Sequence, residues 1–197
     1  PKEWAEIWNN VFMQYEKKED GSFGELKQKN VDTGMGVERT LAILNKCNSV
    51  YETNMLFPLI QKQEQLSGKK YGQDLGETKS MRIIADHIKA AVFIIADGVV
   101  PSNTGRGYVV RRLIRRAIRH SKKLGINENF TAKVAQVVFS IYPDYDELEK
   151  NRNSILTNLD EEENKFRKTL EKGLLIFAKK QSKNIEDHIK KYGKSTR

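Results

Sequence analysis

Cysteine is almost absent from this 197-residue sequence, which contains Cys47 alone. A single thiol excludes an internal disulfide, and three scattered histidines exclude an ordinary zinc cluster, because such sites need several grouped cysteine or histidine ligands. Long apolar runs are also missing, since no stretch approaches the ~20 residues of a membrane span, and no signal peptide is present. We therefore expect a soluble, cytoplasmic protein with no metal site of its own and no membrane partner.

Acidic residues are missing from one long segment of an otherwise mixed sequence. The chain has 35 Lys and Arg against 26 Asp and Glu, a formal net charge of +9, which favours a polyanionic partner. No Asp or Glu lies between Gly98 and Ile126. Nothing close in sequence therefore neutralises the basic residues there. The segment opens with a loop, residues 97–107, that carries three glycines and a proline.

A basic amphipathic helix is predicted over residues 108–124, directly after this loop. At about 100° per residue, its basic side chains fall within one arc of roughly 140° and its apolar side chains lie opposite. The basic arc consists of Arg111, Arg112, Arg115, Arg116, Arg119, Lys122 and Lys123. The apolar arc consists of Val109, Val110, Leu113, Ile114, Ala117, Ile118 and Leu124. Such a helix buries one face in its own core and offers the other to nucleic-acid phosphates.

Other interpretations of the basic helix and its loop stay open at this level. The basic face is also compatible with a merely solvated surface, or more weakly with an anionic membrane, although the apolar face lacks the Trp and Phe of a lipid-inserting helix. In the loop, the Asn103 amide has the paired donor and acceptor needed to read a base edge. Asn103 is equally well placed to be the N-cap of the helix.

The first part of the chain predicts a strand, a turn, a second strand and a helix. Residues 6–15 are rich in aromatic and branched side chains, Asp20-Gly21 is a turn signal, and a second extended piece leads to Val31. Residues 30–44 then have the form strand, Gly-x-Gly loop, helix. Asp32 before the loop and Arg39 after it flank one opening. There a carboxylate can hold an ammonium and a guanidinium can bind phosphate or stack on a base.

The remaining sequence predicts helices, so the expected fold class is α+β and mainly α: a short antiparallel β segment followed by a helical bundle. Expected helices cover 50–66 with an interruption near Pro58, 78–96, 129–142, and a charged region 144–183 with Gly173 as its candidate break. The acidic run 160–163 is expected to be a solvated face. Helical spacing places a core stripe on 78–96, formed by Met81, Ile84, Ala85, Ile88, Ala91, Val92 and Ile95.

Separate segments, in this order, resemble the alanyl-tRNA synthetases, a family of class II aminoacyl-tRNA synthetases. They are EIWNNVFMQ at 6–14, VDTGMGVER at 31–39, and IADHI at 84–88 together with DGVVPSNTGRGYVVRR at 97–112. The resemblance extends from about residue 3 to about residue 180. It implies an enzyme that activates alanine with ATP and Mg²⁺ to alanyl-adenylate, and then transfers alanine to the 3′ end of tRNA.

The resemblance also implies roles for residues near the second strand. Asp32 would hold the ammonium group of alanine, Asn9 would help to position the amino acid, and Gly34 would line the small pocket. The stretch from Gly34 to Arg39 resembles class II motif 3, whose arginine stacks over adenine. Gly34, Gly36 and Arg39 are accordingly the expected ATP-binding residues.

In the basic segment, Asn103 resembles the asparagine with which this family inspects the G·U wobble pair in the acceptor stem of alanine tRNA. This fits the general division between contacts that specify a sequence and contacts that position the partner. The positioning contacts to tRNA phosphates are expected from Arg106, Arg111, Arg112, Arg115, Arg116 and Arg119.

Parts of the family pattern lie outside this sequence. Motifs 1 and 2 would precede the first residue, and a second G·U reader and the editing domain would follow Arg197. We therefore expect residues 1–46 to be the end of a class II catalytic domain with motif 3. Residues 47–197 would be a tRNA-recognition domain that is incomplete at its C-terminus, and the fragment alone would be catalytically inactive. The alternatives are a non-catalytic helical RNA-binding module and a DNA-binding helix-turn-helix.

Overall fold

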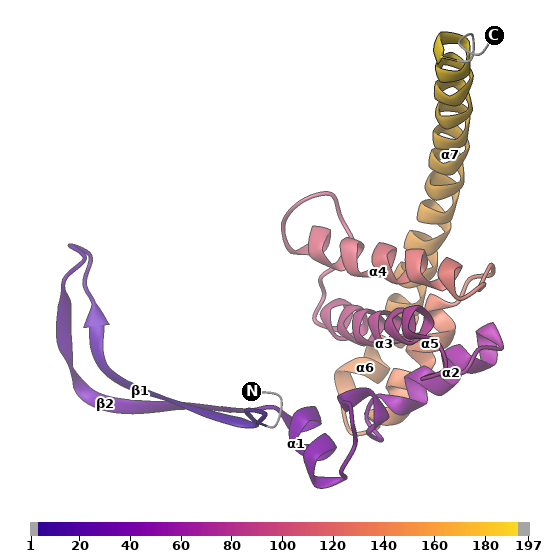
Figure 1. Ribbon diagram of the computed structural model, residues 1–197. Coiled ribbons are helices and arrows are strands. Elements are labelled where there is room, and N and C mark those ends of the chain that lie inside the picture. Colours follow the sequence, from indigo (N-terminus) through magenta and orange to yellow (C-terminus); the bar gives the residue numbers. More distant parts are fainter. Residues whose placement is uncertain (1–3, 193–197) are drawn as a thin grey trace. The chain divides into compact units, whose positions relative to one another are not determined.

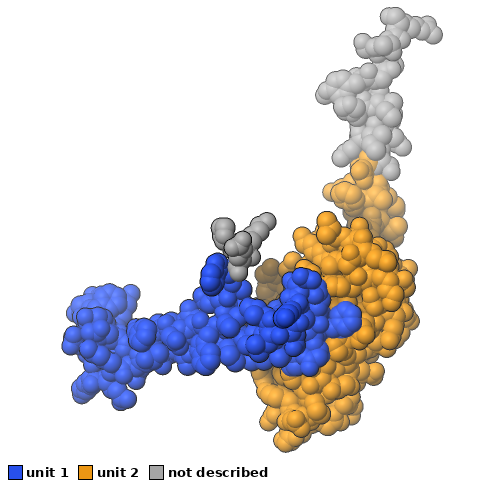
Figure 2. Space-filling view, turned by 60° about the horizontal axis from the view of Figure 1, so that its bottom comes forward, with its two compact units in different colours: residues 1–57 blue, residues 58–197 orange. Residues whose placement is uncertain are grey.

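The structure is a computed structural model that describes residues 4–192, with side chains described as far as residue 181. The chain divides into two compact units, residues 1–57 and residues 58–197, which we call unit 1 and unit 2 (Figure 2). Residues 1–3 and 193–197, the outer ends of the two expected domains, lie outside the described part. The fold is α+β and mainly helical, as predicted.

Unit 1 is built on a long β-hairpin (Figure 1). Strand β1 (Trp8–Lys17) pairs antiparallel with strand β2 (Phe23–Met35). The connection is the predicted turn: Asp20 Oδ1 accepts hydrogen bonds from the Ser22 amide at 2.9 Å and the Ser22 hydroxyl at 2.6 Å, while Gly21 takes a φ of +84°. These bonds lower the pKa of Asp20 because they favour its ionised form. The pairing register shifts between Met13 and Tyr15.

Strand β2 continues further than the sequence pattern indicated. The expected Gly-x-Gly loop is absent, because Gly34 still pairs with Asn9 and Met35 still pairs with Trp8. Helix α1 (Val37–Leu44) starts immediately afterwards, with Gly36 as its N-cap residue. The short 3-10 helix η1 (Val50–Glu52) follows, capped by the Ser49 hydroxyl, which accepts from the Tyr51 amide.

Unit 2 is a helical bundle with α3 at its centre. Its helices are α2 (Phe57–Ser67), α3 (Leu75–Ala96), α4 (Gly105–Lys123), α5 (Thr131–Ile141), α6 (Asp146–Lys150) and α7 (Arg152–Tyr192). Helix α3 contacts α4, α5, α6 and α7 (Figure 1). Every member of the predicted core stripe on α3 is buried, so the helical period read from the sequence was correct.

Two expected interruptions differ in the structure. Pro58 does not interrupt a helix, because α2 begins at Phe57 and Pro58 lies in its first turn, where a missing amide proton costs no hydrogen bond. Gly173 does not break the last helix, and α7 runs through it. A Cβ added at Gly173 would meet no atom within 4 Å. Glycine there lowers helix propensity without any steric cause for a kink.

Candidate functional site

The loop between α3 and α4 is held by hydrogen bonds to its own backbone. Gly98, with a φ of +84°, ends α3 and donates to Ile95 O at 2.9 Å. The Ser102 amide donates to Gly107 O at 3.1 Å, and the Ser102 hydroxyl donates to Thr104 O at 2.8 Å. Residues 100–104 are therefore folded back onto the first turn of α4.

Gly107 is required by this arrangement, because a Cβ at that position would lie 2.3 Å from Val100 O and 2.4 Å from Ser102 Oγ. We predict that Gly107→Ala displaces the loop and lowers the free energy of unfolding by about 1–3 kcal/mol, as overpacking does. Urea unfolding followed by circular dichroism measures it. Gly173→Ala is the matched control, since it should raise stability by about 0.5–1 kcal/mol. Equal effects of the two substitutions would contradict the steric argument.

Asn103 lies at the outer turn of this loop with its side chain exposed. The N-cap of α4 is Thr104, which makes no side-chain cap hydrogen bond, so the structure does not use Asn103 as the cap. Among residues 4–181, no group is hydrogen-bonded to the Asn103 amide. Its donor and acceptor both remain available to a partner.

The basic arc of α4 is divided by its packing. Arg111 and Arg115 turn toward α7, where their Nε atoms lie 3.5 Å and 2.5 Å from Glu162 Oε1. The Arg115 guanidinium also lies over the ring of Phe166, 4.9 Å from its centroid. The sequence predicted that no acidic residue would neutralise the basic side chains of this helix. That prediction fails at Arg111 and Arg115, because a carboxylate distant in sequence pairs with both.

The exposed part of the arc forms a single row on α4, which we call the cationic row: Arg112, Arg116, Arg119 and Lys123. No carboxylate among the described side chains forms an ion pair with a member of this row. Near its start, Arg112 lies over the ring of Tyr108 at 5.8 Å, and Arg106 is exposed in the first turn. Lys123 was missing from the expected contacts, although its spacing of four residues from Arg119 places it on the same face.

The position of Val109 also differs from the prediction. It was expected in the apolar arc, but its side chain is 53% exposed. On an ideal helix Val109 lies only about 20° from Arg116. It therefore borders the cationic row and faces solvent with it.

The hairpin brings together the residues expected to bind an amino acid. Directly paired residues of an antiparallel ladder point to the same side, as do residues two apart on one strand. Asn9 pairs with Gly34, and Val11 pairs with Asp32. Asn9, Asp32 and Gly34 consequently share one face, and all three are exposed. The opposite face carries Trp8, Asn10 and Thr33, which are joined through the Thr33 hydroxyl.

The expected nucleotide-binding residues follow at the end of β2. The Arg39 guanidinium donates to Glu6 O at 2.5 Å, and the Gly36 amide donates to Ile7 O at 3.0 Å, so both are tied to the segment that precedes β1. Gly34 has open space where a Cβ would stand, and its φ is not positive. Neither backbone conformation nor internal packing therefore requires glycine at position 34.

The described part of the chain has neither a metal-binding cluster nor a helix that could span a membrane. Within it, no group of three or more His, Cys, Asp or Glu side chains could hold a metal ion. None of the helices in that part of the chain combines the length and the apolar character that crossing a membrane requires.

Comparison with known proteins gives a consistent result. The sequence profile of the family described as "tRNA synthetases class II (A)" matches residues 2–192. The alanine–tRNA ligase of Borrelia hermsii is 52% identical over 179 residues, which are 89% of this chain and 30% of that protein. The ligase of Treponema pallidum is 49% identical over 173 residues, 86% of this chain and 29% of that protein.

A more distant relative extends the match along the chain. The alanine–tRNA ligase of Pediococcus pentosaceus is 43% identical over 194 residues, 98% of this chain and 22% of that protein. The chain thus spans less than a third of the length of the curated relatives that it matches. On the profile match over nearly all of its length, the chain belongs to the class II (A) tRNA synthetase family, and the relatives that it resembles are alanine–tRNA ligases.

Proposed function

We propose that this chain is the part of an alanine–tRNA ligase that contributes to alanine and ATP binding through its hairpin and recognises the acceptor stem of tRNA(Ala) through its helical unit. The complete enzyme would activate alanine with ATP to alanyl-adenylate and transfer it to the tRNA. In this proposal residues 1–46 belong to the catalytic domain and residues 47–197 to the tRNA-recognition domain.

The observation that carries the RNA-binding part is that an available amide directly precedes a helix whose cationic row forms no ion pair with the described side chains. The Asn103 side chain is exposed and has no hydrogen-bond partner among the described residues, and the row begins within three turns of it. An amide can read the donor and acceptor pattern of a base pair, whereas guanidinium groups bind phosphates without regard to sequence. Asn103 would inspect the G·U pair, and Arg106, Arg112, Arg116 and Arg119 would position the duplex.

Arg111 and Arg115 have a different place in the proposal. Their pairing with Glu162 holds their guanidinium groups beside α7, so each would contact a phosphate only through its remaining N–H groups. We propose that they support the position of α4 and add a weaker electrostatic attraction.

The shared face of the hairpin supports the amino-acid-binding part. A carboxylate at Asp32 can hold the ammonium of alanine, and the Asn9 amide lies on the same face to orient it. The open space at Gly34 would leave room for the substrate, because no side chain of the described residues fills it.

For ATP, the relevant group is the Arg39 guanidinium, which the bond to Glu6 O holds in place. A planar guanidinium held in this way can stack on adenine. When bound, Mg²⁺ would neutralise charge on the ATP phosphates. We assign no Mg²⁺ ligand among the described residues, since they contain no suitable cluster.

The RNA-binding proposal predicts a specific effect of Asn103→Ala. Binding of an acceptor-stem RNA duplex should be tighter with the G·U pair than with a G·C pair at the same position. The substitution should reduce this preference by about 5- to 150-fold, because one base-reading amide is worth about 1–3 kcal/mol of discrimination. Affinity for the G·C duplex should change by less than about twofold. Fluorescence anisotropy with both duplexes measures the effect.

The control is Asn153→Ala, which removes another exposed amide, near the start of α7. It should leave both affinities unchanged. A duplex DNA of the same sequence forms the second arm: equal affinity for DNA and RNA without a G·U preference would support a DNA-binding helix-turn-helix instead. The proposal would also be rejected if Asn103→Ala weakened binding to both RNA duplexes to the same extent.

A further inference from the structure

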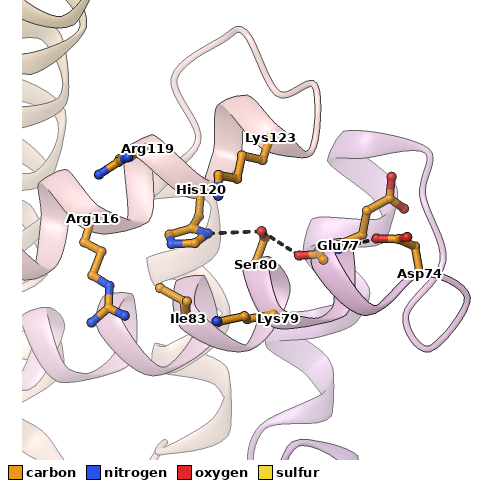
Figure 3. Close-up of a pocket in the computed structure, with 10 residues that line it drawn as sticks. Asp74, Glu77, Lys79, Ser80, Ile83, Arg116, Arg119, His120 and Lys123 are labelled. Atoms are coloured by element: carbon orange, nitrogen blue, oxygen red, sulfur yellow. Dashed lines mark hydrogen bonds between the residues drawn. The ribbon is translucent and has the colours of Figure 1, made fainter.

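A groove lies between the start of α3 and the end of α4 in unit 2 (Figure 3). Its volume is about 580 Å³. From α4, the side chains of Arg116, Arg119 and Lys123 line it. Lys79 and Ser80 of α3 line its opposite side. None of the residue roles assigned above explains why these groups meet there.

The groove carries a net positive charge. It is lined by three members of the cationic row and by Lys79. Two acidic side chains also line it, but both have partners: Asp74 Oδ1 accepts from the Glu77 amide at 2.8 Å, and Glu77 forms an ion pair with Lys69.

His120 lines the groove, and its hydrogen bond to Ser80 fixes the tautomer of its ring. The Ser80 hydroxyl donates to Gly76 O at 2.8 Å, so the His120 Nδ1 atom, 3.0 Å from Ser80 Oγ, must be the donor in that contact (Figure 3). In the neutral imidazole, Nε2 is then an acceptor, and it becomes an N–H donor only when the ring is protonated. The ring is therefore able to respond to an anion.

The surroundings of His120 oppose that protonation in the absence of an anion. Partial burial lowers its pKa most, and the cations Lys123, Arg116 and Arg119 on its own helix lower it further, with a small contribution from His87 on α3. Lys79 adds a further positive charge on the α3 side of the groove. A negatively charged group in the groove would offset the effect of these cations and so raise the pKa of His120 above its value in the empty groove.

We infer that the α3–α4 groove binds a phosphate group, held by Arg116, Arg119, Lys123 and Lys79, with His120 becoming a further donor on binding. Guanidinium and ammonium groups line the groove from two helices, and both kinds of group bind the acceptor oxygens of a phosphate. The site adds Lys79, Lys123 and His120 to the residues that we assign to partner binding.

The phosphate is assigned to the backbone of the bound RNA, and this assignment rests on the proposed function. The cationic row extends from Arg112 to Lys123, or about 17 Å of helix axis, and its last three members line the groove. A duplex lying along the row from Asn103 would therefore bring its backbone to the groove. A free inorganic phosphate has the same chemistry and is the competing source.

Nuclear magnetic resonance of His120 tests the site in this 197-residue chain. The ring resonance is identified by its loss in His120→Asn, and its pH titration is followed with no ligand, with inorganic phosphate, and with the G·U RNA duplex at constant ionic strength. We expect the RNA to raise the pKa of His120 and inorganic phosphate to have little effect. A rise with inorganic phosphate but none with RNA would overturn the assignment to the RNA backbone. No change with either would overturn the phosphate site.

Salt dependence of binding provides a second measurement. Each phosphate contact contributes about 0.9 to the slope of log affinity against log salt concentration. Lys79→Gln combined with Lys123→Gln, which removes the two lysines that only the groove proposal assigns to RNA, should therefore make the slope shallower by about 2 and weaken binding by about tenfold at ~0.1 M salt. Lys150→Gln removes an exposed charge of α6 as the control and should leave both unchanged.

The two proposals fail in different ways. The groove variants should weaken G·U and G·C duplexes equally, because a phosphate contact carries no sequence information. An unchanged salt slope in the double variant would reject the groove while leaving the Asn103 result intact. An Asn103→Ala variant without effect on the preference would reject base reading while the groove result stands.

Discussion

Replacing Glu163 with Ala is expected to lower the free energy of unfolding by about 3–5 kcal/mol, the range for removing one partner of a buried ion pair. The Glu163 side chain is fully buried, with Arg167 Nη2 2.7 Å from Oε1. Its other oxygen, Oε2, accepts from the Phe130 amide at 3.1 Å and the Thr131 amide at 2.9 Å. The substitution removes all these acceptors together.

The position of Glu163 explains why the cost is large. Helix α5 begins at Thr131 without a side-chain cap of its own, so its first amides would have no acceptor. Glu163 supplies that acceptor from α7 and so joins the start of α5 to the long last helix. Arg167 completes the connection by donating to Asn127 O at 3.1 Å. With Glu163 gone, this cation would be largely buried without a counterion.

Urea unfolding followed by the helical circular dichroism signal measures the loss. The control, Glu161→Ala, removes a neighbouring carboxylate whose bond to Lys165 is exposed, and it should cost less than about 1 kcal/mol. Glu163→Gln should fall between the two, because it keeps one acceptor oxygen but loses the charge. If Glu163→Ala lowered the free energy of unfolding no more than Glu161→Ala does, the cap would not contribute to stability.

The burial of Glu162 and Glu163 was not predictable from the sequence. The run 160–163 was expected to be a solvated face, yet Glu162 is only 7% exposed and Glu163 is fully buried. Glu162 pairs with Arg111 and Arg115 of α4, and Arg115 is 47 residues away from it in the sequence. A pattern of charges along one helix predicts pairs three or four residues apart, but it carries no information on which distant helix will lie beside it.

Features that depend on local periodicity were predictable. The core stripe of α3 and most of the apolar face of α4 follow from a spacing of 3.6 residues, because burial on a helix repeats with its turn. The hairpin turn at Asp20-Gly21 follows from local side-chain bonding and the positive φ of Gly21. Val109 was misplaced because it lies at the border of the two arcs, where packing rather than period decides exposure.

The candidate site was predictable only in part, for the same reason. Asn103 and the arginines of α4 are close in sequence, so a helix and its preceding loop already place them together. The groove is different, because Lys79 and Ser80 reach His120 only through the packing of α3 against α4. On the hairpin, the pairing of Asn9 with Gly34 depends on the register of the two strands. That register changes between Met13 and Tyr15, so it cannot be counted out from the turn alone.

The largest functional effect is expected from Asp32→Asn in a full-length alanine–tRNA ligase that contains this chain. The substitution keeps the shape of the side chain and removes the charge that would hold the ammonium of alanine. Losing one partner of a desolvated charge pair costs about 2–5 kcal/mol, which is roughly a 30- to 4,000-fold reduction in kcat/KM for alanine in ATP–pyrophosphate exchange. The KM for ATP and the affinity for tRNA should change little.

The matched control is Asp20→Asn, which makes the same chemical change on the same hairpin. Asp20 lies at the turn, where its carboxylate accepts from Ser22, and not on the face shared by Asn9, Asp32 and Gly34. Its substitution should leave exchange intact. Exchange that survives Asp32→Asn would favour the alternative of a non-catalytic RNA-binding module with a purely structural hairpin. A loss expressed in the KM for ATP alone would place Asp32 at the nucleotide instead of the amino acid.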